Sequence, residues 1–356
     1  MGLVLFLPQL LLALPAGIIA DRLDRRLVCV SVALAEMAGL GLLAALAMLG
    51  TRSLAIYLSA VAIVGIAHAI GAPAERSLLA GIVQSQSFVR AQALSSSIGQ
   101  LIKIAGPSLG GVLIAIGTPA AFGVSATCYA ASALGFAFLQ PRSVTHDDMP
   151  MLRAAIAGIR FIFERKVVLG AISLDLFAVL FGGATALLPV YASTILHVGP
   201  TGYGALMSAP ALGAALVAAF IARHPISRSA GPLLFWCVAG FGVFTIVFGF
   251  SRNFWLSLLA LALTGGFDMV SMVIRSVLVQ LRTPDAMRGR VNAVENVFIG
   301  ASNELGAFES GTLAQFIGAQ GSVVLGGVAT LVVIGVWTVL FPALRSFDRL
   351  VEPANG

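Results

Sequence analysis

Long apolar segments follow one another along this chain, separated by short polar loops. A helix of about 20 apolar residues crosses the hydrocarbon core of a bilayer, so each segment predicts one membrane-spanning helix. We expect eleven of them, near residues 2–20, 27–50, 54–73, 94–117, 119–140, 167–190, 202–222, 231–250, 254–274, 291–317 and 321–342. The chain is therefore predicted to be an all-α, polytopic membrane protein.

The composition agrees with this prediction and excludes several classes of function. Charged residues make up 10% of the 356 residues, whereas a soluble domain carries about 25%. The three cysteines are isolated and the four histidines lie in separate segments, so neither a disulfide nor a metal site is expected. The two lysines lie outside any phosphate-binding loop. We expect no cofactor and no nucleic-acid partner, and a membrane enzyme is a weak alternative.

Basic residues are distributed unevenly between the two sets of loops. Eighteen of the 21 Lys and Arg residues, Arg275 among them, fall in one set, and only Arg52 and Arg252 fall in the other. Lys and Arg accumulate in cytoplasmic loops. The rich side is therefore predicted to be cytoplasmic, and so is the C-terminus.

Short landmarks repeat along the chain and indicate two parallel repeats, a common plan in transporters. They recur at spacings of 199 to 201 residues: Arg76 with Arg275, Thr51 with Ser251, and Arg22 with Arg223. The alternative is chance similarity between short apolar flanks. Subtracting this period from the span at 167–190 places its partner before Met1. We therefore expect twelve helices minus the first, through a misassigned start or a genuine truncation.

The repeats predict the domain organisation. We expect an N-terminal bundle in residues 1–140, a cytoplasmic linker in 141–166, a C-terminal six-helix bundle in 167–345 and a cytoplasmic tail in 346–356. The linker carries an amphipathic pattern typical of a helix at the membrane surface. Its apolar face is predicted to hold Leu152, Ala155, Ile159 and Phe163.

The stretch "GIIADRLDRR" concentrates charge between two apolar segments. Gly17, Asp21, Arg22, Arg25 and Arg26 match G-x-x-x-D-R-x-x-R-R, the signature loop of the major facilitator superfamily, which the chain resembles. An acid near a helix end can pair with Arg or face the positive end of another helix. Such a contact holds in one relative position of the two halves, so we interpret the loop as a gating latch. A solvated loop that only sets topology is the alternative.

A second motif, "GPSLGG", resembles the G-P-x-x-G-G motif in the fifth helix of exporters of this superfamily. It contains Gly106, Pro107, Gly110 and Gly111. Proline removes a backbone hydrogen bond and glycines allow close packing, although a bare packing kink is an equal alternative. The loop "TPDAMRGRV" resembles the branch of enterobactin-exporter-like and macrolide-efflux-like permeases.

The resemblance implies the two-repeat fold, alternating access and proton-coupled export of a small amphipathic compound, drug-like or siderophore-like. The implied partners are this compound, protons and the lipid bilayer, for a monomer in the bacterial inner membrane. Two further departures stand out besides the first helix. The second-half loop "ARHPISRSAG" lacks the acid, and His68 stands where many relatives carry an arginine. We interpret His68 as a packing residue.

Several ionisable residues fall inside the predicted spans, where each costs about 2.5–3.5 kcal/mol to insert. Asp268 is placed about six residues from the cytoplasmic end of its helix, roughly 9 Å deep. Asp175 and Lys103 are placed roughly 12 and 13 Å deep, and Glu304 is also central. Lys103 can neutralise only one of these acids. Asp175 and Asp268 are therefore the first candidates for proton coupling, with Glu304 third.

The segment 291–317 also has a polar face. Two helical turns cover about seven residues, so residues seven apart share a face. One row holds Glu295, Ser302 and Glu309, and the adjacent row holds Asn296, Asn303 and Ser310. This stripe predicts a helix that faces a water-filled path, with hydrogen bonding between helices as the alternative. The chain as a whole is read as an exporter or as a truncated, non-transporting remnant or scaffold.

Overall fold

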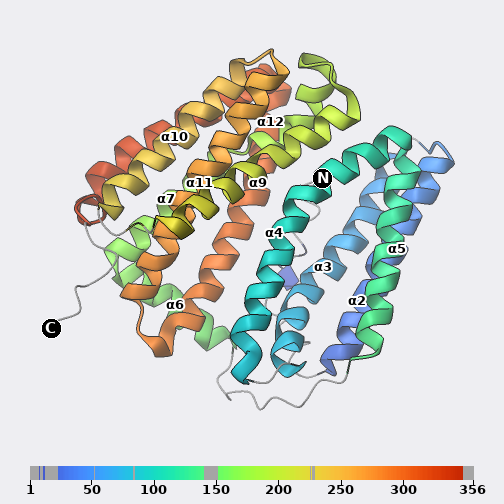
Figure 1. The fold of residues 1–356 in the computed structure, drawn as a ribbon, viewed down its shortest axis with the longest axis horizontal. Coiled ribbons are helices and arrows are strands. Elements are labelled where there is room, and N and C mark those ends of the chain that lie inside the picture. The colour runs from blue at the N-terminus through green and yellow to red at the C-terminus, as the bar shows by residue number, and fades with distance from the viewer. Residues whose placement is uncertain are drawn as a thin grey trace. The chain divides into compact units, whose positions relative to one another are not determined.

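The computed structural model describes residues 8, 11, 12, 23–51, 53–82, 85–139, 151–224, 226 and 229–347. This part of the chain consists of helices and connecting turns and contains no strand (Figure 1). The all-α prediction is confirmed. Most of the predicted span 2–20, with Gly17, Asp21 and Arg22, lies outside the described residues, as do Arg52 and most of the predicted tail.

Contacts divide the chain into two compact units. The first contains residues 1–102 and 109–153, and the second contains residues 103–108 and 154–356. The helices of the first half are α2 (Arg25–Met48), α3 (Leu54–Ile82), α4 (Ser85–Ile116) and α5 (Thr118–Ala137). Within the first unit, α2 packs against both α3 and α5. Small and branched side chains, including Val28, Cys29 and Leu78, fill this contact.

The second half begins with the linker helix. Its elements are α6 (Met151–Glu164), α7 (Lys166–Phe181), η1 (Ala184–Leu187), α8 (Leu188–Val190), η2 (Tyr191–Ile195), α9 (Gly199–Arg223), α10 (Ala230–Phe250), α11 (Phe254–Arg282), α12 (Asp285–Leu340) and α13 (Pro342–Arg345). The four long helices α7, α10, α11 and α12 enclose one apolar core, with α9 packed against α11.

The predicted number of eleven spans is not confirmed. Eight helices in the described part of the chain are long and apolar enough to cross a membrane. Two features account for part of the difference. The apolar portion of α4, Ile104–Ile116, is short, and α12 combines the two predicted spans 291–317 and 321–342. Gly318 separates them with a φ of 77°, a conformation that favours glycine.

The span predicted at 167–190 is one helix in the sequence but an interrupted one in the structure. Helix α7 ends at Phe181, and Gly182 and Gly183 lead into the 3₁₀ turn η1 before the chain regains helical form. Two consecutive glycines lower helix propensity by about 1 kcal/mol each. Non-helical backbone at membrane depth persists where it lines a cavity or is buried in protein. The break in α7 is therefore expected to lie beside a cavity or to be buried in protein.

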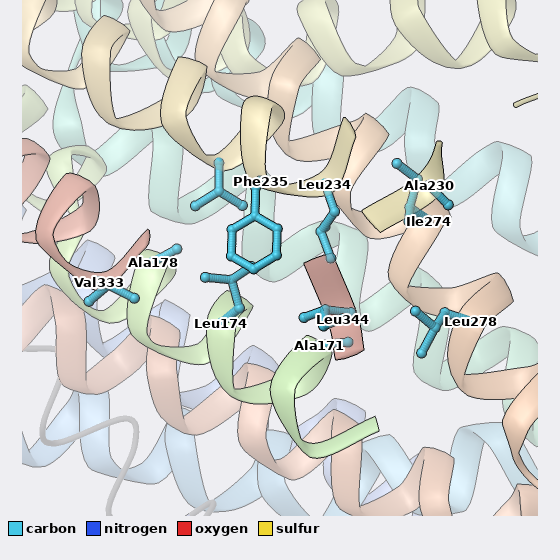
Figure 2. Close-up of a cluster of buried hydrophobic side chains, with 11 residues drawn as sticks. Ala171, Leu174, Ala178, Ala230, Leu234, Phe235, Ile274, Leu278, Val333 and Leu344 are labelled. Atoms are coloured by element: carbon cyan, nitrogen blue, oxygen red, sulfur yellow. The ribbon is translucent and has the colours of Figure 1, made fainter. Parts of the chain in front are cut away.

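The core of the second unit surrounds the first half of α7. Figure 2 shows Leu174 of α7 beside the ring of Phe235 of α10, with Ile274 and Leu278 of α11 in the same cluster. Leu174, Ile274 and Leu278 are fully buried. Complete burial of one such side chain stabilises a fold by about 1.5–3 kcal/mol relative to water. This packing fixes the backbones of α7 and α11 next to two ionisable residues. These are Asp175, which follows Leu174, and Arg275, which follows Ile274.

Helices α9 and α11 approach each other closely at two glycines. A Cβ added to Gly213 would lie 1.7 Å from the carbonyl oxygen of Ala262, and one added to Gly265 would lie 1.9 Å from that of Pro210. Any side chain at either position would therefore force the helices apart. This contact fixes the middle of α11 against α9, one turn before Asp268.

The linker helix α6 has two apolar faces. Ile162 is fully buried in a cluster with Val168 and Val291, and Gly158 lies against the backbone of Arg290. Ile159 and Phe163, on the face predicted from the sequence, remain exposed together with Ile156. The exposed face is the one that suits an interfacial helix, and the buried face attaches α6 to the second unit.

Candidate site inside the C-terminal unit

A buried ion network joins α7, α11 and α12. Arg275 of α11 and Asp175 of α7 are 4% and 7% exposed. A guanidinium nitrogen of Arg275 donates to a carboxylate oxygen of Asp175. The Nε of Arg275 lies 3.3 Å from Oε1 of Glu295 on α12, within ion-pair distance but not aligned for a hydrogen bond. One cation thus stands between two carboxylates on different helices.

The position of Arg275 differs from the sequence prediction. The sequence places Arg275 in a cytoplasmic loop, but α11 extends to Arg282 and Arg275 is buried within it. Its charge balances an acid and carries no information about topology. Asp175 thereby has its counter-charge on α11. The side chain of Lys103, the predicted counter-charge, is outside the described part of the chain.

Asp268 occupies a different environment. It is the central residue of α11, fourteen positions from Phe254 and fourteen from Arg282. At about 1.5 Å per residue it lies roughly 21 Å from either end of the helix, farther from the C-terminal end than the sequence predicted, because α11 is longer than the predicted span. Its half-buried carboxylate makes no hydrogen bond or ion pair with any other described residue. It is therefore an acid without a counter-charge among the described residues.

Two internal cavities meet at Asp268. The smaller, of about 10 Å³, is lined by Asp175, Asp268 and Ser271 together with apolar side chains. This volume suffices for about one water molecule, and the buried Ser271 hydroxyl has no hydrogen-bond partner among the described residues. The larger, of about 180 Å³, is lined by Asp268 and by residues of α7, η1, α9, α10, α11 and α12.

The larger cavity presents mainly hydrogen-bond acceptors. The hydroxyls of Thr245 and Thr264 donate to the carbonyls of Phe241 and Leu261, and the side-chain amide of Asn303 donates to the carbonyl of Ile299. Their oxygen lone pairs remain free to accept from a group in the cavity. No Lys or Arg is found among the described residues that line it. The lining therefore favours a ligand that donates hydrogen bonds and carries positive charge.

The interruption of α7 lies at this same cavity. Val179, Gly182, Gly183 and Thr185 all belong to its lining. The C-terminal end of a helix carries a partial negative charge of about half an electron, and α7 ends at Phe181. The helix end therefore adds negative potential to that of Asp268. Thr185 contributes a hydroxyl that can donate or accept.

The predicted polar stripe on α12 serves three different contacts. Glu295 belongs to the ion network and Asn303 to the larger cavity. Glu309 accepts a 3.3 Å hydrogen bond from Ser310, whose carbonyl accepts one from Ser322. Ser302 is buried and donates to Ile299 of its own helix. Glu304 is half-buried on α12, and the side chain of Asn296 is outside the described part.

Arg26 and His68, in the first half, have contacts within the first unit. Arg26 donates to the carbonyl of Ala137, and its backbone N–H donates to Asp24, the N-cap of α2. Arg25 lies on the same first turn. His68, 60% exposed in its side chain, lies 3.4 Å from the buried carboxylate of Glu36, so it has a partner acid.

The exporter-type motif lies on α4, with Pro107 inside the helix. A Cβ added to Gly106 or Gly110 would meet no described atom within 4 Å. Close helix packing is therefore not observed at these two glycines, and Gly111 is buried.

Comparison with known proteins assigns the family. The family model described as "Transmembrane secretion effector" matches residues 4–355. The chain belongs to this family of major facilitator superfamily transporters. Together with the eight apolar helices, this makes it a multi-pass membrane protein of a transporter family, as the sequence motifs predicted.

Individual relatives agree with that assignment. The enterobactin exporter EntS of Citrobacter koseri is 27% identical over 96% of this chain and 82% of its own length. A mutant of the nucleoside transporter NupG has a TM-score of 0.67 at 15% identity, covering 96% of this chain and 88% of its own. A POT family transporter bound to a thioalcohol-conjugated peptide has a TM-score of 0.69 at 13% identity, with 97% and 88% covered. At these identities the two structures show the fold alone.

Sequence reasoning missed part of this transporter's candidate site. Thr264, Asp268, Ser271 and Arg275 recur at intervals of four, three and four residues, which places them on one face of α11. The kind of periodicity that predicts a polar face in 291–317 also predicts one on α11, and Arg275 belongs to this face. The contact with Asp175 could not be found this way, because it depends on how α7 packs.

Proposed function

We propose that the protein is a secondary active exporter of a small amphipathic compound, driven by exchange for protons through alternating access. The family and the exporters among its relatives support transport of a small molecule outward. Proton exchange is supported by the arrangement of acids in the C-terminal unit. A proton and the exported compound would occupy the same region in turn.

The observation that carries this proposal is the carboxylate of Asp268, which has no partner among the described residues and lies beside two cavities. An ionised carboxylate buried without a counter-ion is costly, and binding a proton or a cation removes that cost. We therefore expect the Asp268 carboxylate to hold a proton or another cation in every state of the transport cycle. Obligatory occupancy by one of two cations in turn is the condition for exchange.

We assign Asp175, Arg275 and Glu295 a supporting role. The guanidinium holds acids of α7 and α12 against α11, so the three helices move as one body when the access state changes. The small cavity is lined by Ser271, Asp175 and Asp268 and so has the polar partners that a bridging water requires. It gives protons a short path between Asp268 and the network.

The signature loop is proposed as the latch between access states. Asp21 and Arg22 carry the contact, with Gly17 for close approach and Arg25 and Arg26 at the start of α2. Asp21→Asn should leave the protein folded and inserted but shift the balance between inward-open and outward-open states. Unchanged accessibility of both faces and an unchanged transport rate would reduce the loop to a topology signal.

The proposed orientation places the linker and the C-terminus in the cytoplasm of a bacterial cell, with the protein acting as a monomer in the inner membrane. Single cysteines at position 52 and in segment 141–166, in a cysteine-free background, test it. An impermeant reagent added to whole cells should label position 52 alone. Labelling of the linker without position 52 would reverse the orientation.

Transport by purified protein in liposomes tests the proposal as a whole. A pH gradient that is acidic on the receiving side should drive uphill accumulation of an exported compound, and collapse of the gradient should abolish it. Asp268→Asn should lose uphill accumulation and keep downhill exchange. Undiminished uphill transport with both Asp175 and Asp268 replaced by Asn would remove them from the mechanism. Inactivity towards every compound in a broad panel would favour the non-transporting alternative.

A further inference from the structure

We propose that the cavity at Asp268 binds the protonated amine of an arylalkylamine, so that the compound exported is an organic cation with an aromatic ring next to its charge. This inference rests on the proposed function and specifies its substrate class. It follows from the chemistry of the cavity wall.

Charge determines the first property of the ligand. The cavity wall contains one carboxylate, the negative end of α7 and no described basic side chain. A carboxylate without a partner attracts a cation, and hydrogen bonds to charged groups are about twice as strong as neutral ones. An anion would meet repulsion from Asp268 and from the helix end.

Hydrogen-bonding capacity determines the second property. Thr245 and Thr264 use their donors on backbone carbonyls of their own helices, and Asn303 does so with one amide hydrogen. An ammonium group has only donors. A primary or secondary ammonium can therefore satisfy several of these acceptors at once, whereas a quaternary ammonium cannot.

Size and shape determine the third property. An apolar cavity of about 150 Å³ holds one benzene molecule, and this cavity measures about 180 Å³. Its volume accommodates one aromatic ring with a short amine arm. Phe241, Phe248 and Leu261 provide apolar wall, and an aromatic ring that lies over a cation adds about 0.5–2 kcal/mol of attraction. A larger substrate would place only this part of itself in the cavity.

The proposal also explains exchange in simple terms. The ammonium and a proton both neutralise Asp268, so the carboxylate cannot hold both at once. Binding of the amine from the cytoplasm would release the proton, and protonation from the outside would release the amine. No covalent step is involved.

Equilibrium binding to the purified, detergent-solubilised protein tests the proposal without any transport. The probes are 2-phenylethylamine as the cation, 2-phenylethanol as its neutral counterpart and phenylacetate as the anion, measured by calorimetry at a pH where the amine is charged. We expect the amine to bind at least about tenfold more tightly than the alcohol, the discrimination expected from one charge-assisted hydrogen bond. Phenylacetate should not bind.

Variants locate the site. Asp268→Asn should weaken amine binding by at least about tenfold and leave binding of the alcohol unchanged, and Asp268→Glu should restore part of the preference. Glu164→Gln on the exposed face of α6 is the matched control, since it removes a distant carboxylate. Gel filtration confirms that each variant is folded.

Several results would overturn the proposal. These are equal binding of amine and alcohol by the unchanged protein, no binding of the amine, amine binding that is indifferent to Asp268, or binding of Na⁺ in place of the amine. Gradient-driven export of neutral compounds together with any of them would leave the proposed function intact and refute only this substrate class. Binding as expected without transport would refute the proposed function and keep the site.

Discussion

Two aspartates line one small cavity in the C-terminal unit, yet their surroundings differ in almost every respect. Asp175 is buried against Arg275, with Glu295 on the far side of the guanidinium. Asp268 has no partner among the described residues and opens on a second, larger cavity. We therefore propose different roles for the two aspartates, according to whether a cationic side chain lies beside them.

A buried acid in a membrane protein can be used in two ways. A paired acid fixes helices to one another, because breaking the pair leaves a buried charge unsatisfied at a cost of about 3–5 kcal/mol. An unpaired acid next to a cavity invites a mobile cation instead. The position of an acid within an apolar segment cannot distinguish these roles, since both aspartates lie well inside such segments.

The largest expected effect is that of Asp268→Asn on gradient-driven transport. Asp268→Asn removes the only charge that a proton could neutralise in the larger cavity's described wall, so gradient-driven accumulation should fall to the level of empty liposomes. Counterflow, which needs no proton movement, should persist at a substrate concentration high enough to offset the weaker binding. Uphill rates in proteoliposomes measure this effect, and accumulation equal to that of the unchanged protein would remove the distinction between the two aspartates.

Arg275→Met should have the largest effect on stability. It leaves two carboxylates without their cation, and the free energy of unfolding should fall by about 3–5 kcal/mol. Thermal unfolding in detergent and the yield of monodisperse protein report it. Arg282→Met is the matched control, because Arg282 is an exposed arginine on the same helix whose guanidinium lies over the ring of Phe347, and it should cost at most about 0.5–1 kcal/mol. Equal behaviour of the two variants would show that the network contributes nothing.

Asp175→Asn should have an intermediate effect. Arg275 keeps Glu295 at ion-pair distance, so the loss of stability should be about 1–3 kcal/mol, less than for Arg275→Met. Proton coupling should survive because Asp268 is intact. Melting temperature and the dependence of transport on the pH gradient are measured together, and loss of coupling with unchanged stability would exchange the roles of the two aspartates.

Glu295→Gln should have the smallest effect. Its carboxylate is near Arg275 but not aligned for a hydrogen bond, so the cost should be about 0.5–1.5 kcal/mol. Comparison of the free energy of unfolding of this variant with that of Asp175→Asn ranks the contributions of the two acids to stability. A greater loss from Glu295→Gln would make Glu295 the main partner of the guanidinium.

The sequence predicted the class of fold and the family, because apolar length and motif spacing are local properties. Isolated charges named both aspartates as candidates, whose role stays a prediction. The sequence placed Asp268 too close to the end of its helix and Arg275 in a loop, because the polar face of α11 makes its C-terminal part look like the end of a span. The pairing of Arg275 with Asp175 and the cavity at the break of α7 depend on packing between helices far apart in the chain. No local pattern carries that information, although Gly182 and Gly183 mark where α7 could be interrupted.

The central claim is that Asp268, and not Asp175, takes up the proton. Infrared difference spectroscopy between neutral and acidic pH tests it directly, because a protonated carboxyl group has its own carbonyl stretch. The other carboxyl groups of the chain contribute to every sample alike, so we expect acidification to produce one component of this band in the unchanged protein and in Asp175→Asn that Asp268→Asn lacks. A band that persists in Asp268→Asn and disappears in Asp175→Asn would contradict the assignment.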